Sequence, residues 1–95
     1  MNIAIDFDGT LERYPYSWDS AIRCFPNNVL FYLVTSRHDC DKGFIREWLG
    51  EMGFNIHSGR IICTNGTAKK WFCEQRGLKI DVWIDDDPAS IINGK

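Results

Sequence analysis

The sequence lacks the features that mark membrane-spanning, disordered and strongly basic proteins. None of its hydrophobic runs approaches the roughly 20 apolar residues that a membrane-spanning helix needs. Its 11 lysine and arginine residues do not outnumber its 13 acidic residues, and the net charge of −2 argues against a general nucleic-acid-binding surface. There is no low-complexity tract, only 3 prolines, and 44% of the residues are hydrophobic, which is typical of a globular domain.

The cysteines are not spaced as a redox or metal motif. Cys24, Cys40, Cys63 and Cys73 include no C-x-x-C pair, so we expect free thiols that are mostly buried. The alternative is a zinc site formed by His38, Cys40 and Cys63. A strand-like segment starts at the second residue with no signal-peptide pattern before it, so we expect a cytoplasmic location.

Strand-like and helix-like segments alternate along the chain. The strongest strand pattern is 29–35, a nearly continuous apolar run of the kind buried on both faces of a parallel sheet. The clearest helix has apolar residues at spacings of three and four over 44–52; Asp39 or Asp41 could cap its start, and Gly53 suits its end. The other predicted strands are 2–6, 60–63 and 81–85, and the other predicted helices are 17–25, 67–76 with Thr67 as N-cap, and 88–92 with Asp87 as N-cap.

This alternation predicts the α/β class. At 95 residues the chain forms one domain, 1–95, because little apolar surface remains for a second core. Right-handed connections would place the helices on both faces of a short parallel sheet of about four strands. The predicted fold is therefore a single three-layer α/β/α, Rossmann-like domain.

Two acidic patches directly follow predicted strands at opposite ends of the chain, Asp6–Thr10 (DFDGT) and Asp85–Asp87 (DDD). The C-terminal ends of neighbouring parallel strands line the crevice where open α/β sheets bind ligands. Like charges gathered there repel unless a cation holds them, and Mg²⁺ is the usual oxygen-bound cation. Outside the patches, 8 acidic residues face 11 basic ones, so the remaining surface is compatible with a negatively charged substrate.

The order of these residues resembles the motif set of a known family. Asp6–Thr10 matches the D-x-D-G-T signature of the haloacid dehalogenase (HAD) superfamily, whose members are mainly Mg²⁺-dependent phosphohydrolases. Candidates for the three remaining motifs follow in the family's order: Thr35, then Lys69 or Lys70, then Asp85–Asp86. The resemblance covers essentially the whole chain. It implies a HAD-like fold and a Mg²⁺-dependent phosphatase that acts through an aspartyl-phosphate intermediate.

The resemblance also implies separate roles for the two aspartates of the first motif. The Asp6 carboxylate, ionised at neutral pH, would attack the substrate phosphorus. Asp8 would protonate the leaving oxygen and then take a proton from the water that hydrolyses the intermediate. The backbone carbonyl of Asp8 would also bind the metal. Gly9 would let the chain turn sharply, so that the amides after the first strand face the phosphate.

Polar and charged groups would surround the phosphate in the same scheme. Thr35 would supply a hydroxyl, with Ser36 as the alternative, and Arg37 either reaches the phosphate or only solvates its loop. Lys69 is favoured over Lys70, because Phe72 and Cys73 then lie on the same helix face. The predicted catalytic residues are Asp6, Asp8, Lys69 and Lys70; the predicted substrate-binding residues are Thr10, Thr35, Ser36 and Arg37. The predicted metal ligands are Asp6, Asp8, Asp85 and Asp86, with Asp86 binding directly and Asp85 binding directly or through water.

The chain is too short to hold the cap domain that many members of this superfamily carry. We therefore expect an open site, of the kind that such proteins use on macromolecular substrates. Tyr14, Tyr16 and Trp18 fall in the predicted loop after the first motif and could stack on a ring of the substrate. The substrate could be a phosphorylated nucleotide, a nucleic-acid end or a protein. The alternative function is a non-catalytic phosphate- or partner-binding module on the same fold.

Overall fold

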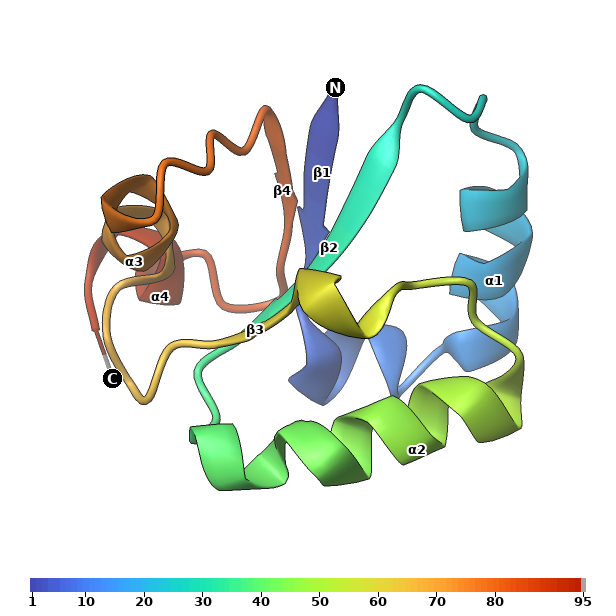
Figure 1. Cartoon of the computed structure of the whole chain (residues 1–95), viewed down its shortest axis with the longest axis horizontal. Coiled ribbons are helices and arrows are strands. Elements are labelled where there is room, and N and C mark those ends of the chain that lie inside the picture. Colours follow the sequence, from blue (N-terminus) through green and yellow to red (C-terminus); the bar gives the residue numbers. More distant parts are fainter. Residues whose placement is uncertain (95) are drawn as a thin grey trace.

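A computed structural model shows a parallel four-stranded sheet whose strands are joined by helices (Figure 1). The structure describes residues 1–94. The strands are β1 (Asn2–Ile5), β2 (Leu30–Thr35), β3 (Ile61–Cys63) and β4 (Val82–Ile84). The α-helices are α1 (Pro15–Arg23), α2 (Lys42–Met52), α3 (Lys69–Gln75) and α4 (Ala89–Ile92), and the short turns are η1 (Phe7–Leu11), η2 (Asp39–Asp41) and η3 (Ser58–Arg60). The predicted α/β class is confirmed.

The strand order is β3-β2-β1-β4, and every strand pair is parallel. Ile5 of β1 is in register with Leu33 of β2 on one side and with Ile84 of β4 on the other. All strands therefore end at the same edge of the sheet, and β1 and β2 are the central strands. The prediction of a short parallel sheet of about four strands is confirmed.

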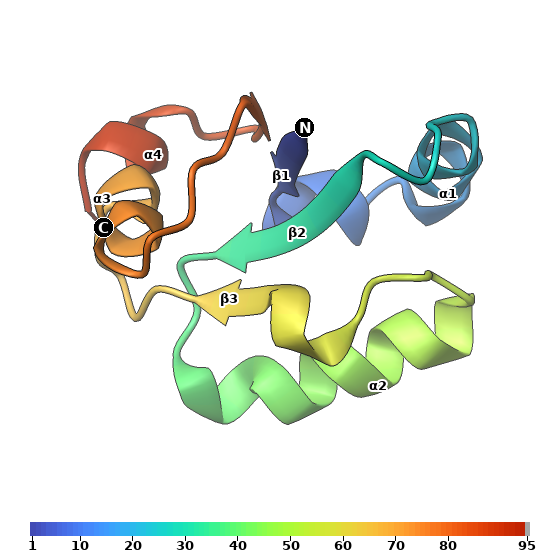
Figure 2. The same ribbon diagram turned by 45° about the horizontal axis from the view of Figure 1, so that its top comes forward.

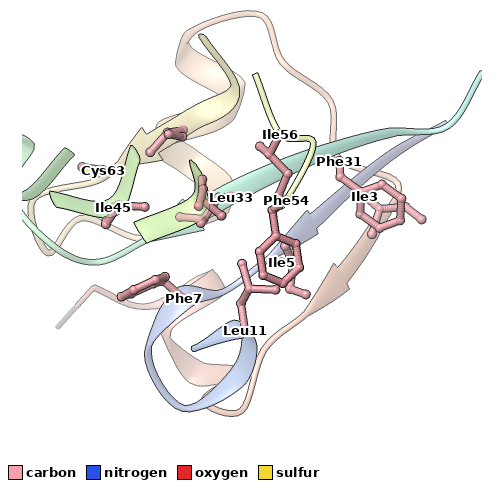
Figure 3. Packing of buried hydrophobic residues seen from close by; sticks show 12 residues of the cluster. Ile3, Ile5, Phe7, Leu11, Phe31, Leu33, Ile45, Phe54, Ile56 and Cys63 are labelled. Atoms are coloured by element: carbon pink, nitrogen blue, oxygen red, sulfur yellow. The ribbon is translucent and has the colours of Figure 1, made fainter. Parts of the chain in front are cut away.

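Alternate side chains of the strands enter two separate hydrophobic clusters, as the two-residue period of a strand requires. Ile3 and Ile5 of β1 belong to the larger cluster, which Ile45 and Leu49 of α2 complete. Figure 3 shows this cluster, with side chains from β1, β2, the turn η1 and the segment after α2 gathered together. The smaller cluster contains Ala4, Val34 and Cys73, and the last of these comes from α3.

The helix α1 begins at Pro15, two residues before the predicted start at Ser17. Proline suits the first turn of a helix, because its fixed φ matches the helix and its missing N–H would have no partner there. Tyr16 and Trp18 therefore both lie on α1, so the predicted aromatic loop was wrong for these two residues, although the predicted helix 17–25 already included Trp18. Trp18 also packs against the larger core cluster.

Of the predicted caps, Asp41 has the N-cap position of its helix, whereas Thr67 and Asp87 do not, and the predicted glycine ends are right. Asp39–Asp41 forms a short helical turn that leads directly into α2, and the side chain of Asp41 makes no capping hydrogen bond. Gly53 ends α2 with φ at +76°, as predicted. The last helix starts at Ala89, and its N-cap position is taken by Pro88 and not by Asp87.

The helix α3 starts at Lys69, two residues after the predicted cap Thr67. A turn takes up the intervening residues: Asn65 and Gly66 have φ values of +55° and +81°, and the Thr67 amide donates to the Thr64 carbonyl at 3.0 Å. Gly77 follows α3 with φ at +72°, where the sequence predicted the helix end. In both views α3 lies beside α4 (Figures 1 and 2).

The cysteines are free, but only half of them are buried. Cys63 and Cys73 lie in the core, whereas Cys24 and Cys40 are exposed, so the expectation of mostly buried thiols is only partly met. Every helix within residues 1–94 is too short or too polar to cross a lipid bilayer.

Candidate functional site

Carboxylates from two neighbouring strands meet where the sheet ends. Asp6 follows β1, and Asp85 and Asp86 follow β4. Each of the three side chains offers an oxygen, and these oxygens lie within 4.8 Å of one another. Asp6 is buried at 7% exposure, whereas Asp86 is open to solvent. Oxygen donors at this spacing could share a hard cation, and the open side at Asp86 would let a ligand reach it.

The zinc site considered from the sequence does not form. Cys63 is buried in the core, whereas His38 and Cys40 are exposed. Among residues 1–94, the group of histidine, cysteine and acidic side chains close enough to share a metal ion is the acidic cluster of Asp6, Asp85 and Asp86.

Lys69 places a buried positive charge against the acidic cluster. Its side chain is only 1% exposed, and its Nζ donates to Asp6 Oδ1 at 3.0 Å and to Asp85 Oδ2. Lys69 is the first residue of α3, so the start of that helix points its amine at the ends of β1 and β4. Lys70 is rotated by about 100° around the helix; it is exposed and lines a separate cavity with Glu74. The structure thus brings Lys69, and not Lys70, to the aspartates.

Burial of the Asp6 carboxyl raises its pKa from 3.8 to about 7. The pairing with Lys69 acts in the opposite direction, and the nearby Asp85 and Asp86 raise the pKa further. The protonated form of this carboxyl therefore persists to a much higher pH than that of a free aspartate, whereas the sequence led us to expect full ionisation. A cation among the three carboxylates would lower the pKa again, because it stabilises the charged form.

Asp8 does not join the acidic cluster through its carboxylate. It pairs with Arg37, whose Nε donates to Oδ2 at 2.9 Å and whose Nη2 donates to Oδ1 at 2.8 Å. The guanidinium also lies over the rings of Phe7 and Phe44, at 5.2 and 5.7 Å from their centroids. The hydrogen bonds that the Asp8 carboxylate accepts from Arg37 raise the pKa of Arg37. This pair was not predicted, because its residues are 29 positions apart and nothing local in the sequence connects them.

Gly9 and Thr10 fit tightly against Asp86. A Cβ on Gly9 would clash with the carboxylate of Asp86, and the Gly9 φ of +76° is unfavourable for other residues. The Thr10 hydroxyl is buried and donates to Asp86 Oδ1 at 3.3 Å. The turn η1 that carries them has hydrogen bonds five residues back, from Leu11 to Asp6 and from Glu12 to Phe7. Thr10 therefore positions Asp86, a contact that the prediction of substrate binding did not include.

Thr35 and Ser36 lie at the same edge of the sheet, after β2. Thr35 is fully buried, and its Oγ1 accepts a hydrogen bond from the Arg37 amide at 3.3 Å. The Thr35 carbonyl accepts from the Thr64 amide at 2.8 Å, and the Ser36 carbonyl accepts from the Gly66 amide at 2.9 Å. These bonds join the loop after β2 to the loop that leads into Lys69.

Thr64 is a polar residue of this region that sequence reasoning missed. Its Oγ1 is buried and has no hydrogen-bond partner among residues 1–94. A buried hydroxyl normally has a partner, so Thr64 is unusual in the loop between β3 and α3. Its position after the short strand β3, within a Thr-Asn-Gly turn, gave no signal beyond that of an ordinary turn.

Comparisons of the chain with protein-family models, with curated proteins and with solved structures gave no match. The motif resemblance therefore stays a prediction from the sequence. Any proposal about function depends on the arrangement of Asp6, Asp8, Lys69, Asp85 and Asp86.

Replacing Lys69 should destabilise the protein far more than replacing its neighbour. Lys69→Met leaves Asp6 and Asp85 buried without their positive partner, and we expect a loss of about 3 to 5 kcal/mol in the free energy of unfolding. Lys70→Met changes an exposed charge and should stay within about 0.5 kcal/mol. Urea denaturation at pH 7 in the presence of a chelator measures both. Similar losses in the two variants would contradict the placement of Lys69.

The pKa of Asp6 should make stability depend on pH. The pKa of Asp6 is about 7 in the folded state and 3.8 in the unfolded state. The contribution of Asp6 to the free energy of unfolding is therefore fully present below pH 3.8 and is lost as the pH rises through about 7. With chelator present, the unfolding free energy of the wild type should fall relative to that of Asp6→Asn by about 1 kcal/mol per pH unit across this window. Urea denaturation at several pH values checks this, and a constant difference would contradict it.

Proposed function

We propose that the protein is a Mg²⁺-dependent phosphatase that acts on phosphate monoesters through Asp6. The observation that supports this most is the buried contact of Lys69 with both Asp6 and Asp85, next to the exposed carboxylate of Asp86. Residues from three of the motifs that resemble the HAD superfamily meet in that contact, and Thr35 lies at the same edge of the sheet.

We further infer that the fold is a three-layer α/β/α, HAD-like domain without a cap. The two hydrophobic clusters, one completed by α2 and the other by α3, support helices on both faces of the sheet. A short turn, η1, and four further residues connect β1 to α1, which leaves no space for an inserted domain there. The site would then be open to large phosphorylated substrates.

The oxygen donors fit Mg²⁺ better than a softer metal. Asp6 and Asp86 would bind it together with the backbone carbonyl of Asp8, and Asp85 would bind directly or through water. Bound there, Mg²⁺ would neutralise the phosphate charge and make the phosphorus easier to attack. The raised pKa of Asp6 agrees with a site that needs more positive charge than Lys69 alone supplies.

The chain's own residues would carry the two chemical steps. The Asp6 carboxylate attacks phosphorus while the bond to the ester oxygen breaks, and Asp8 gives that oxygen a proton. In the second step Asp8 takes a proton from water, the water oxygen attacks the phosphorus, and Asp6 is released. Lys69 stabilises the charge on Asp6 and the transferred group, and Thr35, with Ser36 as the alternative, would donate a hydroxyl to the phosphate.

Arg37 would change partners during this cycle. In the structure both of its bonding edges are near carboxylates, because Asp8 takes Nε and Nη2 and Asp41 lies 4.0 Å from Nη1. A phosphate group would compete with Asp8 for the guanidinium, since both accept paired hydrogen bonds from arginine. Its arrival would release Asp8 to reach the leaving oxygen.

The same pair supports the second candidate function, a non-catalytic module that binds a phosphate or a partner. A carboxylate held by two hydrogen bonds from Arg37 is not free to transfer protons.

For the phosphatase, we infer a cytoplasmic location and a phosphorylated partner without a general nucleic-acid-binding surface. The free cysteines and the absence of strong positive charge support these inferences.

The phosphatase proposal predicts that Mg²⁺-dependent hydrolysis of p-nitrophenyl phosphate is lost in Asp6→Asn. Asp8→Asn should lower the rate of hydrolysis of an alkyl phosphate by about 10² to 10⁴-fold, because the alkoxide leaving group needs a proton. The loss should be much smaller on p-nitrophenyl phosphate, whose leaving group needs none. Steady-state kinetics on both esters measure these changes, with Asp19→Asn on α1 as a control that keeps full activity.

Two results would contradict the proposal. Activity that survives in Asp6→Asn, or that persists with chelator, would exclude Asp6 as the nucleophile in a metal-dependent reaction. A wild type that binds phosphate but releases none from either ester would favour the non-catalytic module.

A further inference from the structure

A cavity of about 240 Å³ opens beside the acidic cluster, where β4 ends. It is lined by Gly9, Thr10, Tyr14, Trp18, Ile84, Asp85 and Asp86. The aromatic and aliphatic residues come from the start of α1 and the end of β4, while the two carboxylates belong to the acidic cluster. The cavity therefore joins an apolar surface to two of the residues proposed to hold the cation.

The backbone fixes the aromatic part of this cavity relative to the first motif. The Tyr14 amide donates to the Thr10 carbonyl at 3.3 Å, and the Trp18 amide donates to the Tyr14 carbonyl at 3.1 Å. Trp18 packs against the larger core cluster and is partly buried. The Tyr14 side chain is 53% exposed and so keeps surface available to a ligand.

Tyr16 differs from Tyr14 although it is only two positions away. It lies on α1, it is 77% exposed, and it is not among the residues that line the cavity. The three aromatic residues grouped together from the sequence therefore separate into two that face the cavity and one that does not. Tyr16 provides a matched control for Tyr14.

We propose that this cavity binds the organic group of the substrate and selects phosphate monoesters that carry an uncharged flat ring. This inference rests on the proposed phosphatase function, because that function places the ester phosphate at Asp6. A ring attached to the phosphate enters the cavity past Asp86 and stacks on Tyr14 and Trp18, a contact that any flat ring can make. Among residues 1–94, the lining of the cavity contains no lysine or arginine that could pair with a second acidic group on the substrate. Nucleosides and phenols both supply such a ring.

Calorimetry with phosphonates tests the inference without hydrolysis, because the carbon–phosphorus bond is not cleaved. Benzylphosphonate carries a ring and propylphosphonate does not. With Mg²⁺ present, the wild type should bind benzylphosphonate more tightly. Tyr14→Ala should weaken that binding about 5- to 100-fold, the range expected for one stacked ring, and leave propylphosphonate nearly unchanged. Tyr16→Ala should change neither. Tyr14→Phe, which keeps the ring, should bind benzylphosphonate as the wild type does.

Several outcomes would overturn the inference. These are equal affinity of the wild type for both phosphonates, failure to bind either one, and equal effects of Tyr14→Ala on both.

The methylenephosphonate analogue of thymidine monophosphate separates the two sources of the ring: tighter binding than benzylphosphonate assigns a nucleoside, and weaker binding assigns an aryl group. If ring-dependent binding occurs while ester hydrolysis is absent, the cavity assignment stands and the phosphatase proposal fails. If hydrolysis occurs without ring-dependent binding, the phosphatase proposal stands and the cavity assignment fails.

Discussion

The buried amine of Lys69, bonded to Asp6 and Asp85, is the interaction on which the rest of the candidate site depends. Carboxylates from β1 and β4 approach one another closely at the end of a parallel sheet, and their repulsion must be offset for the chain to fold as observed. Lys69 supplies part of that charge, and a cation would supply the remainder. Its position depends in turn on the loops after β2 and β3, which Thr35, Ser36, Thr64 and Gly66 join through backbone hydrogen bonds.

The two ion pairs of the site differ in burial, and this difference suggests different uses. The pair of Lys69 with Asp6 is almost fully buried, so breaking it would leave a charge without water or a partner. The pair of Arg37 with Asp8 is partly exposed, with 33% and 52% of the side chains open to solvent. Exposed pairs contribute little to stability and can be exchanged at small cost. In the proposed cycle the first pair therefore keeps its geometry while the second changes partner.

The central strands and the ends of the helices at glycine could be predicted because local physical chemistry determines them. The apolar run of β2 and the positive φ of Gly53 and Gly77 depend on residues close in sequence. The caps were less predictable. The turn at Asn65 and Gly66 moved the start of α3 from Thr67 to Lys69, and a proline at the first turn moved the start of α1 from Ser17 to Pro15, which makes Tyr16 helical.

In the candidate site, the sequence predicted which residues lie at the sheet edge but not how they pair. The choice between Lys69 and Lys70 became clear only with the direction of α3, because adjacent helical residues point about 100° apart. The bond of Asp8 with Arg37 and the contact of Gly9 with Asp86 depend on tertiary contacts across the sheet. Residues far apart in the sequence give no pattern from which such contacts can be inferred.

Titration calorimetry with Mg²⁺ at pH 7 tests the central claim most directly, because it measures the cation that the carboxylates are proposed to share. The wild type should bind one Mg²⁺ per chain, and Asp86→Ala should lose this binding, whereas Asp81→Ala, at an acidic position before β4, should keep it. Failure of the wild type to bind Mg²⁺, or unchanged binding in Asp86→Ala, would contradict the proposed metal site and with it the phosphatase mechanism.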